Sequence, residues 1–223
     1  MNIVDSIKTL NERKLLMRRV LEIAIFGALY FALFTLLEKV NATDVFILHN
    51  RLDEIIPFVP GFIIPYVLWF PYMGISVAWF ALLDTEGPDY WRMTRSLAFG
   101  CVVFLIISWV FPNGQDLRPD VANLGNSVFE SIIKSLYSGD TSTNVFPSLH
   151  CYNSIAACEA WCHSKMLKGH PVIKALIIIL SVSICLSTMF CKQHSSYDVF
   201  GAIILFGICY LLMFIRDKKM AKQ

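Results

Sequence analysis

Two histidines in separate polar stretches are the residues of this chain best suited to chemistry. His150 closes the stretch 147–150 (PSLH), and His194 stands four residues before Asp198. The apolar sequence between the two histidines is long enough for two membrane crossings of about 20 residues each, which form one helical hairpin. Both imidazoles are therefore expected at the same face of a membrane. Because ionisable groups at membrane depth are costly and indicate function, the pair predicts an enzyme.

The first stretch is expected to begin a helix, because proline is favoured at the first helical position and Pro147 would occupy it. The backbone N–H groups of Ser148, Leu149 and His150 then lack partners within the helix, and such a terminus binds phosphate. Ser148 adds a hydroxyl donor. We therefore predict a phosphate site at Ser148 and Leu149, with His150 placed to protonate an oxygen that leaves the phosphorus.

The second stretch places His194 and Asp198 on one face of a helix, because residues four apart lie one above the other. A carboxylate at one imidazole nitrogen fixes the tautomer and leaves the other nitrogen free as a nucleophile or base. Arg118, in the same outer region, offers a planar guanidinium that suits a phosphate. The alternative for Arg118 is an interfacial side chain that contacts lipid headgroups.

The composition indicates a membrane protein, since 56% of the 223 residues are hydrophobic and the mean hydropathy is +0.58. The net charge of +2 gives no argument for nucleic acid binding. We predict an all-α polytopic membrane protein: a six-transmembrane-helix bundle with short interfacial helices, forming one domain over 1–223 with its motifs within 112–200. Apolar runs of roughly spanning length cover 20–37, 61–83, 96–111, 147–164, 172–190 and 198–215. The run 147–164 is polar enough to belong in the middle of the bundle.

The basic residues predict the orientation in the membrane. Fourteen of the nineteen lysines and arginines lie in the N-terminal segment, the loops 84–95 and 164–174, and the C-terminal tail. By the positive-inside rule both termini are cytoplasmic, and the face with the histidines is extracytoplasmic or luminal.

Two short helices are expected at the membrane surface. Apolar residues at mixed helical spacing suggest one in the N-terminal segment before the first crossing. In the loop 121–146, Ser127 and Glu130 form a capping-box pattern ahead of apolar residues at helical spacing. This second helix either lines the path of lipid entry or is a packed lid without contact to substrate.

The seven cysteines are expected mainly as small buried hydrophobes, and none has the spacing of a metal site. Cys151 and Cys191 both lie beside the histidines, so a disulfide between them stays open.

These motifs resemble those of the type 2 phosphatidic acid phosphatase superfamily, over about 96–215. The family has three motifs. The first is Lys followed by Arg-Pro, the second is Pro-Ser-Gly-His, and the third is Ser-Arg, five residues, His, three residues and Asp. The stretch Arg118-Pro119 matches the end of the first motif. The second is matched with Leu149 in place of glycine, and the third by Ser187, His194 and Asp198.

The resemblance implies a role for each matched residue. His194 would attack phosphorus to give a phosphohistidine, and Asp198 would hold it in line. His150 would protonate the departing alcohol, while Arg118 and Ser148 would clamp the phosphoryl oxygens.

Two positions depart from the family pattern: its first-motif lysine falls at Phe111 and its third-motif arginine at Thr188. Two phosphate-binding cations are thus missing, and Lys192 and Gln193 are expected to replace part of their contacts with the phosphate. This departure resembles the branch of sphingomyelin and inositol phosphorylceramide synthases, which transfer a phosphoryl headgroup to another alcohol.

The resulting expectation is a membrane-embedded phosphatase that hydrolyses a lipid phosphate or diphosphate, with membrane lipids as its surroundings and no cofactor, metal or nucleic acid. The oligomeric state stays open. The first alternative is a lipid phosphotransferase that uses the same site. A metal-dependent hydrolase with His150, His194 and Asp198 as zinc ligands is a second alternative. A transporter or an inactive lipid-binding relative is disfavoured, because the chain shows no internal repeat.

Overall fold

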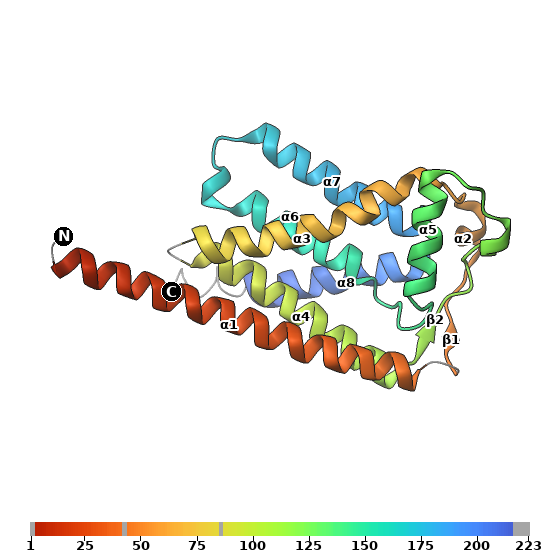
Figure 1. Cartoon of the computed structure of the whole chain (residues 1–223), viewed down its shortest axis with the longest axis horizontal. Coiled ribbons are helices and arrows are strands. Elements are labelled where there is room, and N and C mark those ends of the chain that lie inside the picture. The colour runs from red at the N-terminus through yellow and green to blue at the C-terminus, as the bar shows by residue number, and fades with distance from the viewer. Residues whose placement is uncertain (1–2, 42–43, 85–86, 216–223) are drawn as a thin grey trace.

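The computed structural model describes residues 3–41, 44–84 and 87–215 as a bundle of long helices with short elements gathered at one end (Figure 1). The long helices are α1 (Ile3–Val40), α3 (Ile63–Leu83), α4 (Pro88–Val110), α6 (Leu149–His163), α7 (Pro171–Phe190) and α8 (Ser196–Tyr210). The short elements at that end, which we call the histidine end, are β1 (Phe46–Ile47), α2 (Arg51–Ile55), β2 (Asn113–Gly114) and α5 (Val128–Gly139). Single turns complete the chain: η1 (Pro60–Phe62), η2 (Val121–Asn123), η3 (Lys165–Leu167) and the π-helical η4 (Leu211–Ile215).

Five helical segments in the described part of the chain are long and apolar enough to cross a membrane. They are Asn11–Val40, Pro60–Leu83, Pro88–Val110, Pro171–Phe190 and Ser196–Met213. The protein is therefore an all-α polytopic membrane protein, as the sequence predicted. The sixth predicted crossing, α6, has only 15 residues and carries polar side chains such as His150 and Glu159, so it does not meet the same criterion.

Helix α6 lies in the middle of the bundle, where it packs against α3, α4, α7 and α8. Its position depends on a close approach to α4 at Gly100, where an added Cβ would meet the Tyr152 ring at 2.0 Å. The Tyr152 hydroxyl donates a hydrogen bond of 2.9 Å to the carbonyl oxygen of Ser96 on α4. The small residue and the buried hydroxyl together fix the depth at which the first turn of α6 lies.

Helix α1 is one continuous helix from Ile3 to Val40, so the predicted surface helix before the first crossing is not a separate element. Only 6% of its most apolar window is buried within the bundle, and α1 contacts mainly α4 and α3. Most of its apolar side chains are therefore left for lipid.

The predicted amphipathic helix is present as α5, which begins after the N-cap Ser127 and ends at Gly139. Ser127 and Glu130 form the expected reciprocal capping box. All seven cysteines are free thiols, and Cys151 and Cys191 are both buried without a bond between them.

Candidate active site

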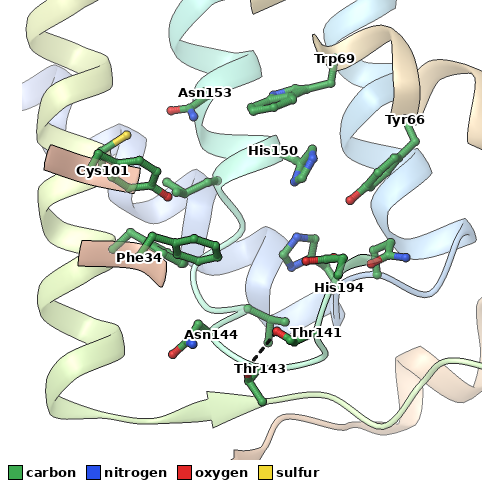
Figure 2. Close-up of a pocket in the computed structure, with 16 residues that line it drawn as sticks. Phe34, Tyr66, Trp69, Cys101, Thr141, Thr143, Asn144, His150, Asn153 and His194 are labelled. Carbon is green, nitrogen blue, oxygen red and sulfur yellow. Dashed lines mark hydrogen bonds between the residues drawn. The ribbon is translucent and has the colours of Figure 1, made fainter. Parts of the chain in front are cut away.

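The two histidines face each other at the histidine end of the bundle, as their hairpin spacing predicted (Figure 2). His150 belongs to the first turn of α6, and His194 to the turn between α7 and α8. Their ring centroids are 5.9 Å apart, and both rings line one cavity of about 180 Å³. The arrangement leaves room for a small group between two imidazoles.

His194 is held by a buried carboxylate. Its Nδ1 lies 3.2 Å from Oδ2 of Asp198, and the backbone N–H of Ser195 donates to the same oxygen at 2.9 Å. Burial alone would lower the pKa of His194, but the hydrogen bond to Asp198 and its negative charge outweigh burial, so the pKa is raised. With Nδ1–H bound to the carboxylate, Nε2 keeps its lone pair for the cavity.

The short helix α2 fixes the turn that carries His194. Oδ2 of Asp53 accepts from the Ser195 hydroxyl at 2.6 Å, and Oδ1 accepts from the backbone N–H of Ser196 at 2.7 Å. Asn50, the N-cap of α2, donates to the Ser196 hydroxyl at 2.7 Å. Sequence reasoning missed these contacts, although Asn50 and Asp53 form a capping-box pair that marks a helix in this loop.

Lys192, which the sequence placed at the phosphate site, serves the same turn. Its ammonium donates to the carbonyl oxygens of Asp53 and Ile56 at 2.6 and 2.5 Å. The residue has φ of +52°, a left-handed conformation that is uncommon for a residue with a Cβ. In the described structure Lys192 therefore ties α2 to the α7–α8 turn and does not line the cavity between the histidines.

His150 lies in an aromatic environment. Its ring centroid is 4.7 Å from that of Tyr66 and 4.4 Å from that of Trp69, both on α3. Nε2 of His150 is buried without a hydrogen-bond partner, and so is Nε1 of Trp69. Tyr66 and Trp69 are three residues apart and so share a helix face, which is the signal that sequence reasoning passed over.

Ser148 and Leu149 occupy the start of α6, two residues further along than the proline signal predicted. Ser148 is the N-cap, fully buried, and its hydroxyl accepts from the backbone N–H of Cys151 at 3.4 Å. Its own N–H donates to the carbonyl oxygen of Asp198 at 3.0 Å, so it joins the two histidine motifs directly. Leu149 lines the cavity.

Arg118 reaches the cavity through Gln193, which lines it. The Arg118 guanidinium donates to Oε1 of Gln193 at 2.7 Å and to Oδ2 of Asp140 at 3.1 Å, and it lies over the Tyr137 ring at 4.8 Å. Further hydrogen bonds go to the backbone oxygens of Asp140 and Thr141. These contacts gather the predicted residues Arg118 and Gln193 beside His194.

Several nitrogen atoms around this site have no hydrogen-bond partner although they are buried: Nε2 of His150, Nε2 of Gln193, Nε1 of Trp69 and Nε of Arg118. Buried polar groups without partners are rare in native proteins, and each one calls for an explanation. An anion between the histidines would supply acceptors to the three of these residues that line the cavity, His150, Gln193 and Trp69. The arrangement therefore suits a phosphate group.

A larger opening of about 820 Å³ leads into the same site between α3 and α5. It shares Tyr66, Asp140 and His150 with the cavity, and its walls include Phe70 of α3 and Ile132 of α5. The amphipathic helix α5 thus borders an entrance, which favours the first of its two predicted roles.

No group of three or more His, Cys, Asp and Glu side chains in the described residues is arranged to hold a metal ion. Asp198 meets His194 and not His150. The geometry gives no support to the alternative in which both histidines and Asp198 bind zinc.

The fold and the site together define a polytopic membrane protein with two histidines and a buried carboxylate around a cavity suited to an anion. A family model described as the PAP2 superfamily matches residues 89–222, which is more than half of the chain. The chain therefore belongs to the PAP2 superfamily. No curated protein and no solved structure matches it.

Proposed function

We propose that the protein is a membrane-embedded phosphatase that hydrolyses a lipid phosphate or diphosphate through a phosphohistidine at His194. Members of the PAP2 superfamily are phosphatases or related phosphotransferases. The observation that carries the proposal is the pairing of His194 with the buried Asp198, 5.9 Å across a cavity from His150. The whole chain, 1–223, acts as one domain, and both termini lie in the cytoplasm.

In the first step, Nε2 of His194 attacks phosphorus, and for a lipid monophosphate the bond from phosphorus to the lipid oxygen breaks. Protonated His150 gives its Nε2 proton to that oxygen, so the alcohol leaves neutral. For a diphosphate the terminal phosphorus is attacked, its bond to the bridging oxygen breaks, and the lipid monophosphate leaves. The bound phosphate stabilises the protonated form of His150, which otherwise meets mainly aromatic rings. Arg118, Gln193 and the N–H of Leu149 hold the phosphoryl oxygens.

In the second step, neutral His150 takes a proton from water as the water oxygen attacks phosphorus. The bond between phosphorus and His194 breaks, and inorganic phosphate leaves. Asp198 stays ionised throughout and stabilises the positive charge that His194 carries while it is bonded to phosphorus.

A lipid phosphotransferase is the second candidate, and two observations favour it. Phe111 and Thr188 stand where hydrolytic relatives would have cations by the sequence resemblance. The cavity also adjoins two separate spaces, the opening between α3 and α5 and a groove between α1 and α4, so a second lipid alcohol has a route to the phosphohistidine. In this reaction the alcohol replaces water in the second step.

The test is a panel of labelled lipid phosphates and diphosphates incubated with the purified protein, with and without lipid alcohols as acceptors. Free phosphate without a new lipid supports hydrolysis, and a labelled new lipid supports transfer. Inhibition by vanadate is expected in both cases. Activity that a chelator removes and an added metal restores would overturn the phosphohistidine mechanism.

The orientation is tested separately with reporters fused to either end of the chain. Reporters that are active only in the cytoplasm should work at both termini. A terminus that reports from the other side would contradict the proposed position of the site.

A further inference from the structure

A groove of about 460 Å³, separate from the opening between α3 and α5, runs between α1 and α4. Apolar side chains form most of its wall, among them Ile23 and Phe26 of α1 and Leu97 and Ala98 of α4. Because α1 buries little of its surface in the bundle, this groove borders the space that lipid occupies.

The groove adjoins the catalytic cavity. Cys101 of α4 and Asn153 of α6 line both spaces. From Cys101 the groove follows α4 to Trp91, ten residues away, which is roughly 15 Å at the rise of an α-helix. The groove leads away from the histidine end. The hydrocarbon chain of a lipid must extend in this direction if its phosphate lies between the histidines.

Asn153 supplies a polar group at the junction. It is only 8% exposed, and its Oδ1 is buried without a partner. It follows His150 by three residues on α6, and both side chains line the catalytic cavity. Figure 2 shows the Asn153 side chain pointing from α6 toward Cys101. A buried carboxamide oxygen without a partner costs free energy that a ligand with an O–H or N–H group would recover.

We infer that the groove between α1 and α4 binds the hydrocarbon chain of the substrate, and that Asn153 recognises a hydroxyl or amide group between this chain and the phosphate. The inference rests on the proposed function, because the phosphate at His194 sets the end from which the chain enters. Asn153 is a specificity-determining residue in this arrangement. The substrate class is a long-chain lipid phosphate with a hydrogen-bond donor close to its headgroup.

The chain-binding part is tested by filling the groove at Gly27, where an added Cβ meets no atom within 4 Å. Gly27→Leu should lower kcat/KM for a long-chain lipid phosphate about tenfold and leave that for a short-chain analogue unchanged. Gly74→Leu is the matched control, because Gly74 on α3 has the same free space and lines none of the three spaces described here. Equal losses in the two variants, or equal losses for the two substrates, would overturn the inference.

The Asn153 part is tested with a monoacylglycerol phosphate that has a free 2-hydroxyl and with its 2-deoxy analogue. Asn153→Leu should reduce kcat/KM about tenfold for the hydroxyl substrate and hardly at all for the deoxy analogue. A variant that loses activity equally on both substrates would show a structural role and overturn the assignment.

A binding measurement separates this inference from the proposed function. A lipid phosphate with a photoreactive group at its chain end is crosslinked to His194→Ala, which needs no turnover. Labelled peptides from 22–27 or 91–101 support the groove even if wild-type protein hydrolyses nothing. Labels confined to α3 and α5, or labels that excess unlabelled lipid phosphate does not compete away, would overturn it even if hydrolysis is observed.

Discussion

The two histidines have different surroundings, and these match the different roles proposed for them. On one side, His194 is fixed by Asp198, and Asp53 holds the neighbouring backbone. On the other, His150 meets the rings of Tyr66 and Trp69, and its Nε2 has no partner. A polar network suits a nucleophile that must attack from one direction. An unpaired ring among aromatic groups suits a proton donor whose charge depends on the bound substrate.

Removal of the proposed nucleophile should have the largest effect on activity. We expect His194→Ala to lower phosphate release by at least about 10³-fold, because no other group occupies its place. Rapid quench with labelled substrate should trap a phosphoenzyme in wild-type protein and none in the variant. Elution in detergent at the wild-type volume is the control for folding, and a phosphoenzyme in the folded variant would contradict the assignment.

Replacing the proton donor should slow the first step mainly when the leaving group needs a proton. In a rapid-quench measurement of phosphoenzyme formation, His150→Gln is expected to lower the rate of this first step about 10²–10⁴-fold on a lipid alcohol phosphate. On a phosphate ester of nitrophenol, whose phenolate leaves unprotonated, the loss in the rate of the first step should be much smaller, while hydrolysis of the phosphoenzyme is slowed equally for both esters. His194→Ala should be equally inactive on both esters. If His150→Gln lost the same factor in the first step on both, His150 would not be the proton donor.

Removal of the Asp198 carboxylate is expected to change both kcat and its pH dependence. Asp198 raises the pKa of His194, and only neutral His194 can attack, so wild-type activity should fall as the pH drops through this raised pKa. Asp198→Asn removes the charge, so His194 stays neutral to lower pH. We expect kcat to fall about 10²-fold and the acid limb of its pH profile to move to lower pH. If the acid limb does not move in Asp198→Asn, a group other than His194 controls it.

The smallest effect is expected from the contact between α2 and the α7–α8 turn. Asp53→Asn weakens the hydrogen bonds to Ser195 and Ser196 and should reduce kcat about tenfold, with a stability loss of about 2 kcal/mol. Glu54→Gln is the control, because Glu54 is adjacent and exposed. Thermal unfolding in detergent and phosphate release measure the two effects. Identical behaviour of the two variants would remove Asp53 from the positioning network.

Local sequence patterns predicted the parts of the site that depend on helix periodicity and on loop length. The spacing of His150 and His194 placed them together, the polarity of α6 placed it inside, and the capping box of Ser127 and Glu130 located α5. In each case the signal lies within a few turns of one helix or in the length of one hairpin.

Contacts between segments far apart in the sequence could not be predicted from such local patterns. Asp53 meets Ser195 across 142 residues of sequence, and no periodicity connects them. Lys192 has the charge expected at a phosphate site, but its left-handed backbone and the nearby carbonyl groups of α2 direct it elsewhere. The groove at Asn153 likewise arises from four helices, α1, α3, α4 and α6, whose relative rotation the sequence pattern leaves undetermined.

The polarity of α6 has a consequence for biosynthesis. A helix of 15 residues with His150, Asn153 and Glu159 is a poor substrate for insertion into lipid as it emerges from the ribosome. Glu159 finds a partner in Arg92 of α4, which is made before α6, but the N–H of the N-cap Ser148 bonds to Asp198 of α8, which is made after it. The start of α6 therefore gains this contact only when α8 has been made, so a chain that stops short of α8 lacks both this contact and the carboxylate that holds His194.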